Sequence, residues 1–356
     1  GWCADRGVRL QPHGKTTMAP QLFARQVAAG SFGLTAATPA QVRTMRRAGF
    51  GRIQLANELT QPREAAWIAQ EISREDGFEF CCWVDSAAGV SILERAAAQH
   101  GVAVDVLIEI GSAGGRTGCR EASDQADVIA ELARSPHVRL VGVAGYEGAV
   151  AGDRSPSSLQ AVREYLRRMR SVAADLLAAG RFEGDGPWTL TAGGSMFFDL
   201  VVTELAAGEH PDAFQIVLRS GCYIAHDHGL FAANPPLAEA DAALRPALTV
   251  WGTVVSVQDR QAFLDVGRRD ISYDQGLPVP LRRHRPGHGD VELVDESVTA
   301  LNDQHAFVRL GPASDVQVGD RIQLGVSHPC TTFDKHRLIP VLDDTGVIID
   351  VVRTFF

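Results

Sequence analysis

Eight short apolar segments, most of them followed by a polar turn and an amphipathic helix pattern, run through the first two-thirds of the chain. Strands that alternate with helices at this spacing predict a parallel sheet, and eight such units predict a closed (β/α)8 barrel of the TIM type. A doubly wound open sheet is the alternative arrangement. The predicted strands are residues 8–12, 32–36, 52–56, 78–84, 103–110, 138–144, 188–192 and 213–218. Helix patterns include residues 20–29, 39–48, 62–75, 87–100, 123–134 and 157–179.

The pattern changes near residue 245, where short alternating strands replace the strand–helix units. We predict strands at residues 248–257, 262–266, 306–310, 321–325, 337–342 and 347–352, with Pro- and Gly-rich turns between them, as at residues 278–280 and 285–289. A chain of 356 residues is too long for one ordinary core. We therefore expect a barrel in residues 1–244 and a β-rich domain in residues 245–356.

The charge and composition of the chain restrict its partners. Hydrophobic residues make up 45% and charged residues 22%, and the net charge is −9 without any run of Lys or Arg. These values argue against nucleic acid or an anionic membrane as the main partner, because both attract clustered cations. No apolar stretch reaches the roughly 20 residues that span a bilayer. The six cysteines form no CxxC pair, so a reduced, cytoplasmic enzyme is expected.

A lysine follows the first predicted strand, within Pro12-His13-Gly14-Lys15-Thr16. In a parallel barrel the reactive groups gather at the carboxyl ends of the strands. Lys15 is one of only two lysines in an Arg-rich chain, the other being Lys335. A partly desolvated lysine can lose its proton and form a Schiff base, which arginine cannot. A surface lysine near a helix N-terminus is the alternative, although the helix dipole disfavours a cation there.

A Gly-rich turn after the seventh strand predicts a phosphate site. Backbone N–H groups and a hydroxyl at the start of a helix can surround a phosphate, and the turn after the eighth strand can complete the site. Tight turns without a ligand are the alternative. The residues concerned are Thr191, Gly193, Gly194 and Ser195 after the seventh strand, and Ser220, Gly221, Cys222 and Tyr223 after the eighth.

His328 and Cys330 are candidate metal ligands in the β-rich region. Residues two apart in a strand point to the same face, so the imidazole and the thiolate could share one ion. Both groups suit Zn²⁺, and two protein ligands leave positions open for water or substrate. A buried cysteine beside a packed histidine is the alternative.

These motifs resemble those of alanine-racemase-like, fold-type III pyridoxal-phosphate enzymes, in the branch of D-threonine aldolases and D-serine dehydratases. Residues 12–17 resemble the PHxKT motif of that family, and residues 328–335 resemble its HxC segment. Further matches lie at residues 33–38, 55–59, 145–148 and 193–195. Members usually carry a strand and a helix before the lysine motif, so we expect an N-terminal segment to be missing here.

The resemblance implies a role for each motif. Lys15 would hold pyridoxal phosphate and move the α-proton, and His13 of the same motif would contact the cofactor. Arg116 and Tyr146 would lie around the pyridine ring, and an arginine at the ring nitrogen would weaken the electron sink. His328 and Cys330 would bind a divalent metal, with zinc expected. Dehydratase-type members tend to have His and Cys at these positions, whereas aldolase-type members tend to have His and Asp.

The implied activity is the metal-dependent conversion of D-serine-like 3-hydroxy-D-amino acids to 2-oxo acids and ammonia. A retro-aldol lyase acting on D-threonine-like substrates is the nearest alternative. An amino acid racemase, a non-catalytic carrier of pyridoxal phosphate and a binding module without cofactor are further alternatives. By analogy with fold-type III relatives we expect a homodimer that acts on a small D-amino acid.

Overall fold

The computed structural model describes residues 1–208, 210–237 and 243–356. The chain forms two compact units: Gly1–Lys15 with Leu22–Gly221, and Thr16–Gln21 with Cys222–Phe356. The second unit thus begins at Cys222, whereas the domain boundary predicted from the sequence at residue 245 stays a prediction. Among the described residues, no helix has both the length and the apolar character needed to span a membrane.

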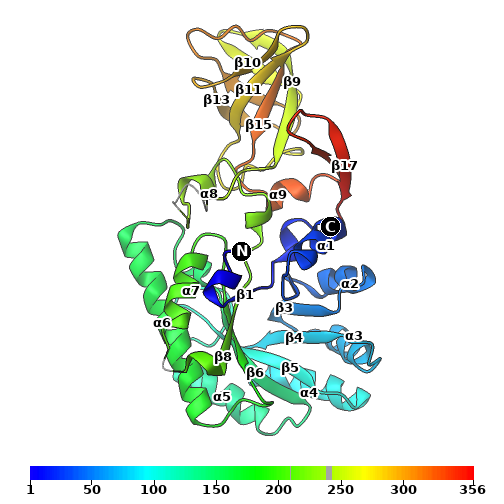
Figure 1. Cartoon of the computed structure of the whole chain (residues 1–356), viewed down its shortest axis with the longest axis vertical. Helices are drawn as coiled ribbons and strands as arrows, with labels where there is room; N and C mark the ends of the chain where they lie inside the picture. Colours follow the sequence, from blue (N-terminus) through cyan, green and yellow to red (C-terminus); the bar gives the residue numbers. More distant parts are fainter. Residues whose placement is uncertain (209, 238–242) are drawn as a thin grey trace. The chain divides into compact units, whose positions relative to one another are not determined.

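The first unit is built on eight parallel strands that follow one another around a curled sheet (Figure 1). The strands β1 and β2 are also linked, because the N–H groups of Phe32 and Thr35 donate to the carbonyls of Leu10 and Pro12, at 2.7 and 2.9 Å. This confirms the predicted (β/α)8 barrel. The strands are β1 Arg9–Leu10, β2 Leu34–Ala36, β3 Arg52–Glu58, β4 Glu79–Val84, β5 Val104–Ile110, β6 Val138–Gly145, β7 Trp188–Ala192 and β8 Phe214–Leu218.

Helices lie on the outer side of these strands (Figure 1). Their starts follow the sequence: Thr38, Ser86 and Ser155 are N-caps whose hydroxyls accept a backbone N–H in the first turn. The helices are α1 Pro20–Ala28, α2 Pro39–Arg47, α3 Pro62–Ile72, α4 Ala87–His100, α5 Ala122–Leu132, α6 Pro156–Ala178 and α7 Phe198–Ala206, with short 3-10 turns η1 Ala4–Arg6, η2 Gly14–Thr16, η3 Glu147–Ala149 and η4 Pro211–Ala213. Four of the described helices, α1, α2, α3 and α6, begin with a proline, at a position where no N–H is needed.

Apolar side chains form one layer of the core of the first unit. Trp83, Leu107 and Ala144, from β4, β5 and β6, make one buried cluster. Beyond this layer, toward the carboxyl ends of the same strands, come Asp85 and Glu109. Because side chains alternate along a strand, Leu107 and Glu109 lie on the same face of β5.

The second unit contains a seven-stranded antiparallel sheet in the order β12-β11-β15-β9-β10-β14-β13 and a separate hairpin of β16 and β17. Its elements are η5 Cys222–Ile224, α8 Leu230–Ala233, β9 Thr249–Gln258, β10 Gln261–Leu264, β11 Val279–Arg285, β12 Gly289–Glu292, β13 Ser297–Leu301, β14 Ala306–Arg309, β15 Arg321–Gly325, α9 Cys330–Phe333, β16 Leu338–Leu342 and β17 Ile348–Arg353. All six predicted strands are present.

The sequence does not predict β11, β12 and β13. It predicts a turn at residues 278–280, but Val279 and Pro280 open β11, where the register against β15 shifts between Pro280 and Arg282. A bulge of this kind tolerates proline, which cannot donate to the ladder. All four residues of β12 are exposed, so this edge strand has no buried face that would give an apolar pattern.

Gly142 in β6 has no side chain, and this allows strands β6 and β7 to approach each other closely. A Cβ atom here would overlap the carbonyl oxygen of Thr189 in β7. We expect Gly142→Ala to lower the free energy of unfolding by about 1–3 kcal/mol, the usual cost of overpacking. Gly152→Ala is the control, because nothing lies within 4 Å of its added Cβ. Equal melting temperatures for the two variants would show that β6 and β7 can separate without cost.

Candidate functional site

The lysine motif lies at the carboxyl end of β1, in the first unit. Lys15 is exposed in the turn η2, and His13 forms a parallel bridge with Thr35. The Nδ1 atom of His13 is buried and has no hydrogen-bond partner among the residues that the structure describes. Burial, together with the nearby charges of Lys15 and Arg219, holds the pKa of His13 well below its usual range. His13 is therefore a neutral imidazole with one polar atom available to a ligand.

Two arginines belong to the same group of strand-end residues as His13. Both lower the pKa of His13 through their charge. The guanidinium of Arg116 lies 4.8 Å from the centre of the Tyr146 ring. Arg219 is buried, donates to Thr191 Oγ1 and to the Gly145 carbonyl at 2.6 Å each, and lies 4.7 Å from the Trp83 ring centre. The structure thus offers Arg219 as well as Arg116 as a cation for a bound cofactor.

The predicted phosphate turn after β7 already holds a carboxylate. The N–H groups of Gly193 and Gly194 donate to the two oxygens of Glu147, at 2.9 and 2.5 Å. Burial raises the pKa of Glu147, and these two N–H groups oppose that rise. In this structure, both N–H groups donate to an internal carboxylate, and the role of Gly193 and Gly194 toward a phosphate stays a prediction.

The other predicted phosphate contacts lie around this turn. Thr191 is fully buried, and its hydroxyl donates to the Val217 carbonyl at 2.7 Å and accepts from Arg219. Ser220 donates to the Gly194 carbonyl at 2.9 Å. Gly221 ends the first unit, and Cys222 and Tyr223 begin the second. The roles of Ser195, Gly221 and Tyr223 toward a phosphate stay predictions.

Three carboxyl groups meet at the ends of β3, β4 and β5. Oxygens of Glu58, Asp85 and Glu109 lie within 4.8 Å of one another. Burial, followed by the interactions with Glu109 and Asp85, raises the pKa of Glu58 to about 9. Three negative charges this close would repel strongly, so a proton on Glu58 relieves the repulsion near neutral pH.

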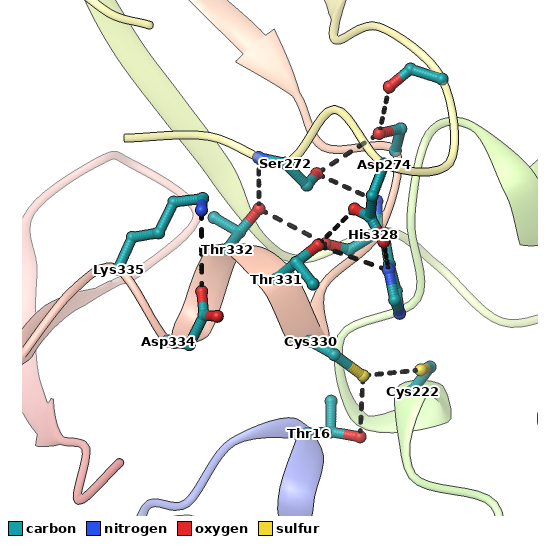
Figure 2. Close-up of polar contacts among 12 residues, drawn as sticks. Thr16, Cys222, Ser272, Asp274, His328, Cys330, Thr331, Thr332, Asp334 and Lys335 are labelled. Carbon is teal, nitrogen blue, oxygen red and sulfur yellow. Dashed lines mark hydrogen bonds and ion pairs between the residues drawn. The ribbon is translucent and has the colours of Figure 1, made fainter. Parts of the chain in front are cut away.

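A second cluster of ligand atoms lies in the second unit. Cys222 at the start of η5, His328 after β15 and Cys330 at the start of α9 each offer one atom, and these atoms all lie within 4.8 Å of one another. Figure 2 shows the sulfurs of Cys222 and Cys330 pointing toward each other, 3.4 Å apart. Imidazole and thiolate are the ligand types that zinc prefers, so this donor set fits a divalent metal.

Asp274 orients the imidazole of His328. Its Oδ2 lies 2.7 Å from Nδ1 of His328, while its Oδ1 accepts from Thr331 Oγ1 at 2.6 Å (Figure 2). A carboxylate can only accept here, so the proton sits on Nδ1 and Nε2 is left as the ligand atom. The N–H of His328 donates to Ser272 Oγ at 3.1 Å, which fixes the backbone of the turn.

The charges of this cluster support one another. A hydrogen bond from Cys222 lowers the pKa of Cys330 well below its usual range; burial opposes the shift and His328 adds to it. Burial would lower the pKa of His328, but Cys330 and Asp274 outweigh it and raise that pKa to about 9. The lowered pKa favours the thiolate form of Cys330, which binds metals, and a metal ion at Nε2 would displace the proton that His328 holds near neutral pH.

Each half of the chain matches a known protein family. Residues 12–198 match the family described as "Alanine racemase, N-terminal domain", and residues 247–342 match "Putative serine dehydratase domain". A D-threonine aldolase of Arthrobacter sp is 30% identical over 361 residues, covering 98% of this chain and 86% of the aldolase. This chain belongs to the alanine-racemase-like family of fold-type III pyridoxal-phosphate enzymes.

Two further proteins are similar to this chain over most of its length. D-threo-3-hydroxyaspartate dehydratase of Delftia sp. (strain HT23) is 28% identical over 346 residues, covering 92% of this chain and 85% of that one. The crystal structure of D-threonine aldolase from Filomicrobium marinum has a TM-score of 0.80 at 22% identity, covering 99% of this chain and 89% of the aldolase.

His328 and Cys330, predicted from the sequence as metal ligands on one face of a strand, have ligand atoms within 4.8 Å of each other but do not lie in a strand. His328 lies in the turn after β15, and Cys330 is the first residue of α9. Their role as metal ligands stays a prediction. Asp274 and Arg219 were not predicted from the sequence. Arg219 directly follows the apolar strand β8, a position where polar strand-end residues are expected.

The Asp274 contact gives a prediction for metal affinity. We expect Asp274→Asn to weaken metal binding about 10–100-fold, because the amide orients His328 less firmly and makes it less basic. Competition with a chelator of known affinity measures this change. The control is Asp334→Asn. This variant removes a carboxylate that is close to His328 in the sequence but does not contact it, and it should bind metal as the wild type does. Equal affinities in both variants would remove Asp274 from the site.

The carboxyl cluster gives a prediction for pH dependence. Folded Glu58 keeps its proton up to a pKa of about 9, whereas the unfolded chain releases it near the ordinary value of 4.5. The free energy of unfolding should therefore fall as the pH rises between these values. Glu58→Gln should flatten this slope in denaturant unfolding between about pH 5 and pH 8. A slope unchanged from the wild type would mean that Glu58 is ionised in the fold.

Proposed function

We propose that this chain is a pyridoxal-phosphate- and metal-dependent lyase that converts 3-hydroxy-D-amino acids such as D-serine to 2-oxo acids and ammonia. The observation that carries the proposal is the meeting of Cys330 and His328 in one ligand cluster. The relatives named above are a dehydratase and an aldolase, and their names specify 3-hydroxy-D-amino acid or D-threonine substrates. Both reactions begin with the same kind of substrate.

The first unit supplies the groups for the cofactor. Bound pyridoxal phosphate withdraws electrons from the α-carbon and thereby acidifies the α-proton. Lys15, which follows a strand end, would hold the cofactor covalently, and its amine would remove that proton. His13, as a neutral imidazole, and Arg116 would contact the cofactor, and Arg219 is held in place by Thr191 and Gly145. The buried Nδ1 atom of His13, which has no partner among the described residues, is the observation that fits a bound group here.

The second unit supplies the groups for the leaving hydroxyl. A divalent ion polarises the bound oxygen and makes the hydroxyl a better leaving group. His328, through Nε2, and the Cys330 thiolate would hold that ion, with Asp274 fixing the imidazole. Soft thiolate ligands favour zinc over magnesium. Dehydration needs such help more than aldol cleavage does, because hydroxide must depart from carbon, whereas cleavage requires only deprotonation of the hydroxyl.

A retro-aldol lyase is the second candidate function. The Arthrobacter D-threonine aldolase has a slightly higher identity than the Delftia dehydratase, 30% against 28%. The two functions differ in their products. D-serine gives pyruvate and ammonia by dehydration, whereas D-threonine gives glycine and acetaldehyde by cleavage.

Product analysis of the reconstituted protein tests the proposal. We expect pyruvate and ammonia from D-serine, and we expect a chelator to abolish their release while the cofactor stays attached. Glycine and acetaldehyde as the dominant products from D-threonine would support the aldolase instead. Full turnover of D-serine by exhaustively metal-free protein would contradict the role of the ion.

The lysine assignment has its own test. Lys15→Ala should prevent borohydride-reducible attachment of pyridoxal phosphate and lower turnover by about 10²–10⁴-fold or more, because both the anchor and the base are lost. Lys335→Ala is the matched control, since Lys335 is the only other lysine of the chain. Mass spectrometry of the reduced protein locates the adduct. An adduct at Lys335, or none in the wild type, would refute the assignment.

A further inference from the structure

The sulfur of Cys222 is a third possible metal-binding atom beside those of His328 and Cys330, the two residues proposed above as metal ligands. Its side chain is buried, and its sulfur lies 3.4 Å from the sulfur of Cys330. A disulfide would need about 2.05 Å, so the two sulfurs are not bonded. The ligand atoms of Cys222, His328 and Cys330 lie within 4.8 Å of one another. The side chain of Cys222 thus lies at the metal ligands and not with the phosphate contacts predicted from the sequence.

The spacing of these atoms suits one tetrahedral ion. Zinc–sulfur bonds of about 2.3 Å at the tetrahedral angle place two sulfurs about 3.8 Å apart. The 3.4 Å between the sulfurs of Cys222 and Cys330 is close to that edge, and small side-chain rotations cover the difference. The alternative is that the two cysteines are neutral thiols in simple apolar packing. That alternative gives no reason for the imidazole of His328 to lie beside both sulfurs.

The surroundings prepare these groups for a cation. Cys330 is contacted by the Cys222 thiol and by the hydroxyl of Thr16, the latter at 3.4 Å (Figure 2). Nδ1 of His328 is held by Asp274, which leaves Nε2 for the ion. An ion held by two thiolates has its double charge neutralised by its own ligands, so burial of the cluster costs less free energy.

We propose that Cys222 is a third protein ligand, which gives the metal a Cys₂His set with one coordination position left open. The inference rests on the proposed function, because it adds a ligand to the His328 and Cys330 pair. Three protein ligands and one open position characterise catalytic zinc sites, whereas structural sites have four. Two thiolates also select strongly against magnesium, calcium and manganese, whose preferred ligands are oxygens. The chain is therefore specialised for a thiophilic ion.

X-ray absorption at the zinc edge tests this on the unaltered, zinc-loaded holoenzyme. We expect two sulfur neighbours at about 2.3 Å. One sulfur neighbour would overturn the role of Cys222 and leave the proposed function standing. No sulfur neighbour would overturn both, because Cys330 would then not be a ligand either. Since no variant is needed, a folding defect cannot obscure the result.

Variants give the second measurement. In the cobalt-loaded protein, Cys222→Ser should lower the sulfur-to-cobalt charge-transfer absorption to about half, because one of two thiolates is lost. Its zinc affinity should fall by more than about tenfold, at least the loss seen for outer-shell partners. Cys3→Ser, a half-buried cysteine outside the cluster, is the control and should keep both values. Wild-type absorption and affinity in Cys222→Ser would overturn the proposal.

Discussion

The closure of a parallel barrel determines where the chemistry of the first unit can occur. The first strand pairs with β8 through Arg9 and Leu10 and is linked to β2 by backbone hydrogen bonds of Phe32 and Thr35. Its carboxyl end must then lie between the ends of both neighbours. Lys15 therefore follows a strand whose two neighbours end near Thr35 and Arg219.

Burial forces the ionisable groups at these strand ends to find partners, and the partners found are specific. Glu147 takes two backbone N–H groups, Arg219 takes a hydroxyl and a carbonyl, and Glu58 keeps a proton. Each solution removes or compensates one buried charge. This compensation is incomplete: among the described residues, Nδ1 of His13, both carboxyl oxygens of Glu58 and Oε2 of Glu109 are buried without a hydrogen-bond partner. Buried polar atoms left without partners at the strand ends are what a site for a bound molecule requires.

The sequence predicted the barrel well, because strand and helix periods differ and the caps at Thr38, Ser86 and Ser155 mark helix starts. It predicted less where residues distant in the chain meet. The carboxylate of Glu147 at Gly193 and Gly194 cannot be read from a Gly-rich turn, since the same N–H groups could serve any anion. Likewise, the sequence did not predict β12 because all four of its residues are exposed, nor β11 because Pro280 lies at a bulge near its start.

In the metal cluster, too, the sequence pairs residues that are close in the chain, whereas only the structure brings in a distant one. His328 and Cys330 are two residues apart, so a sequence motif can pair them, although the motif did not reveal the turn into α9. Cys222 lies more than one hundred residues earlier, and only the fold brings its sulfur to Cys330. A third anionic ligand would hold the ion more firmly but make it a weaker Lewis acid, because more charge reaches the metal. Asp274 acts in the same direction by making His328 more basic. A site built this way favours retention of one thiophilic ion, and the single open position confines that ion to one oxygen of the substrate at a time.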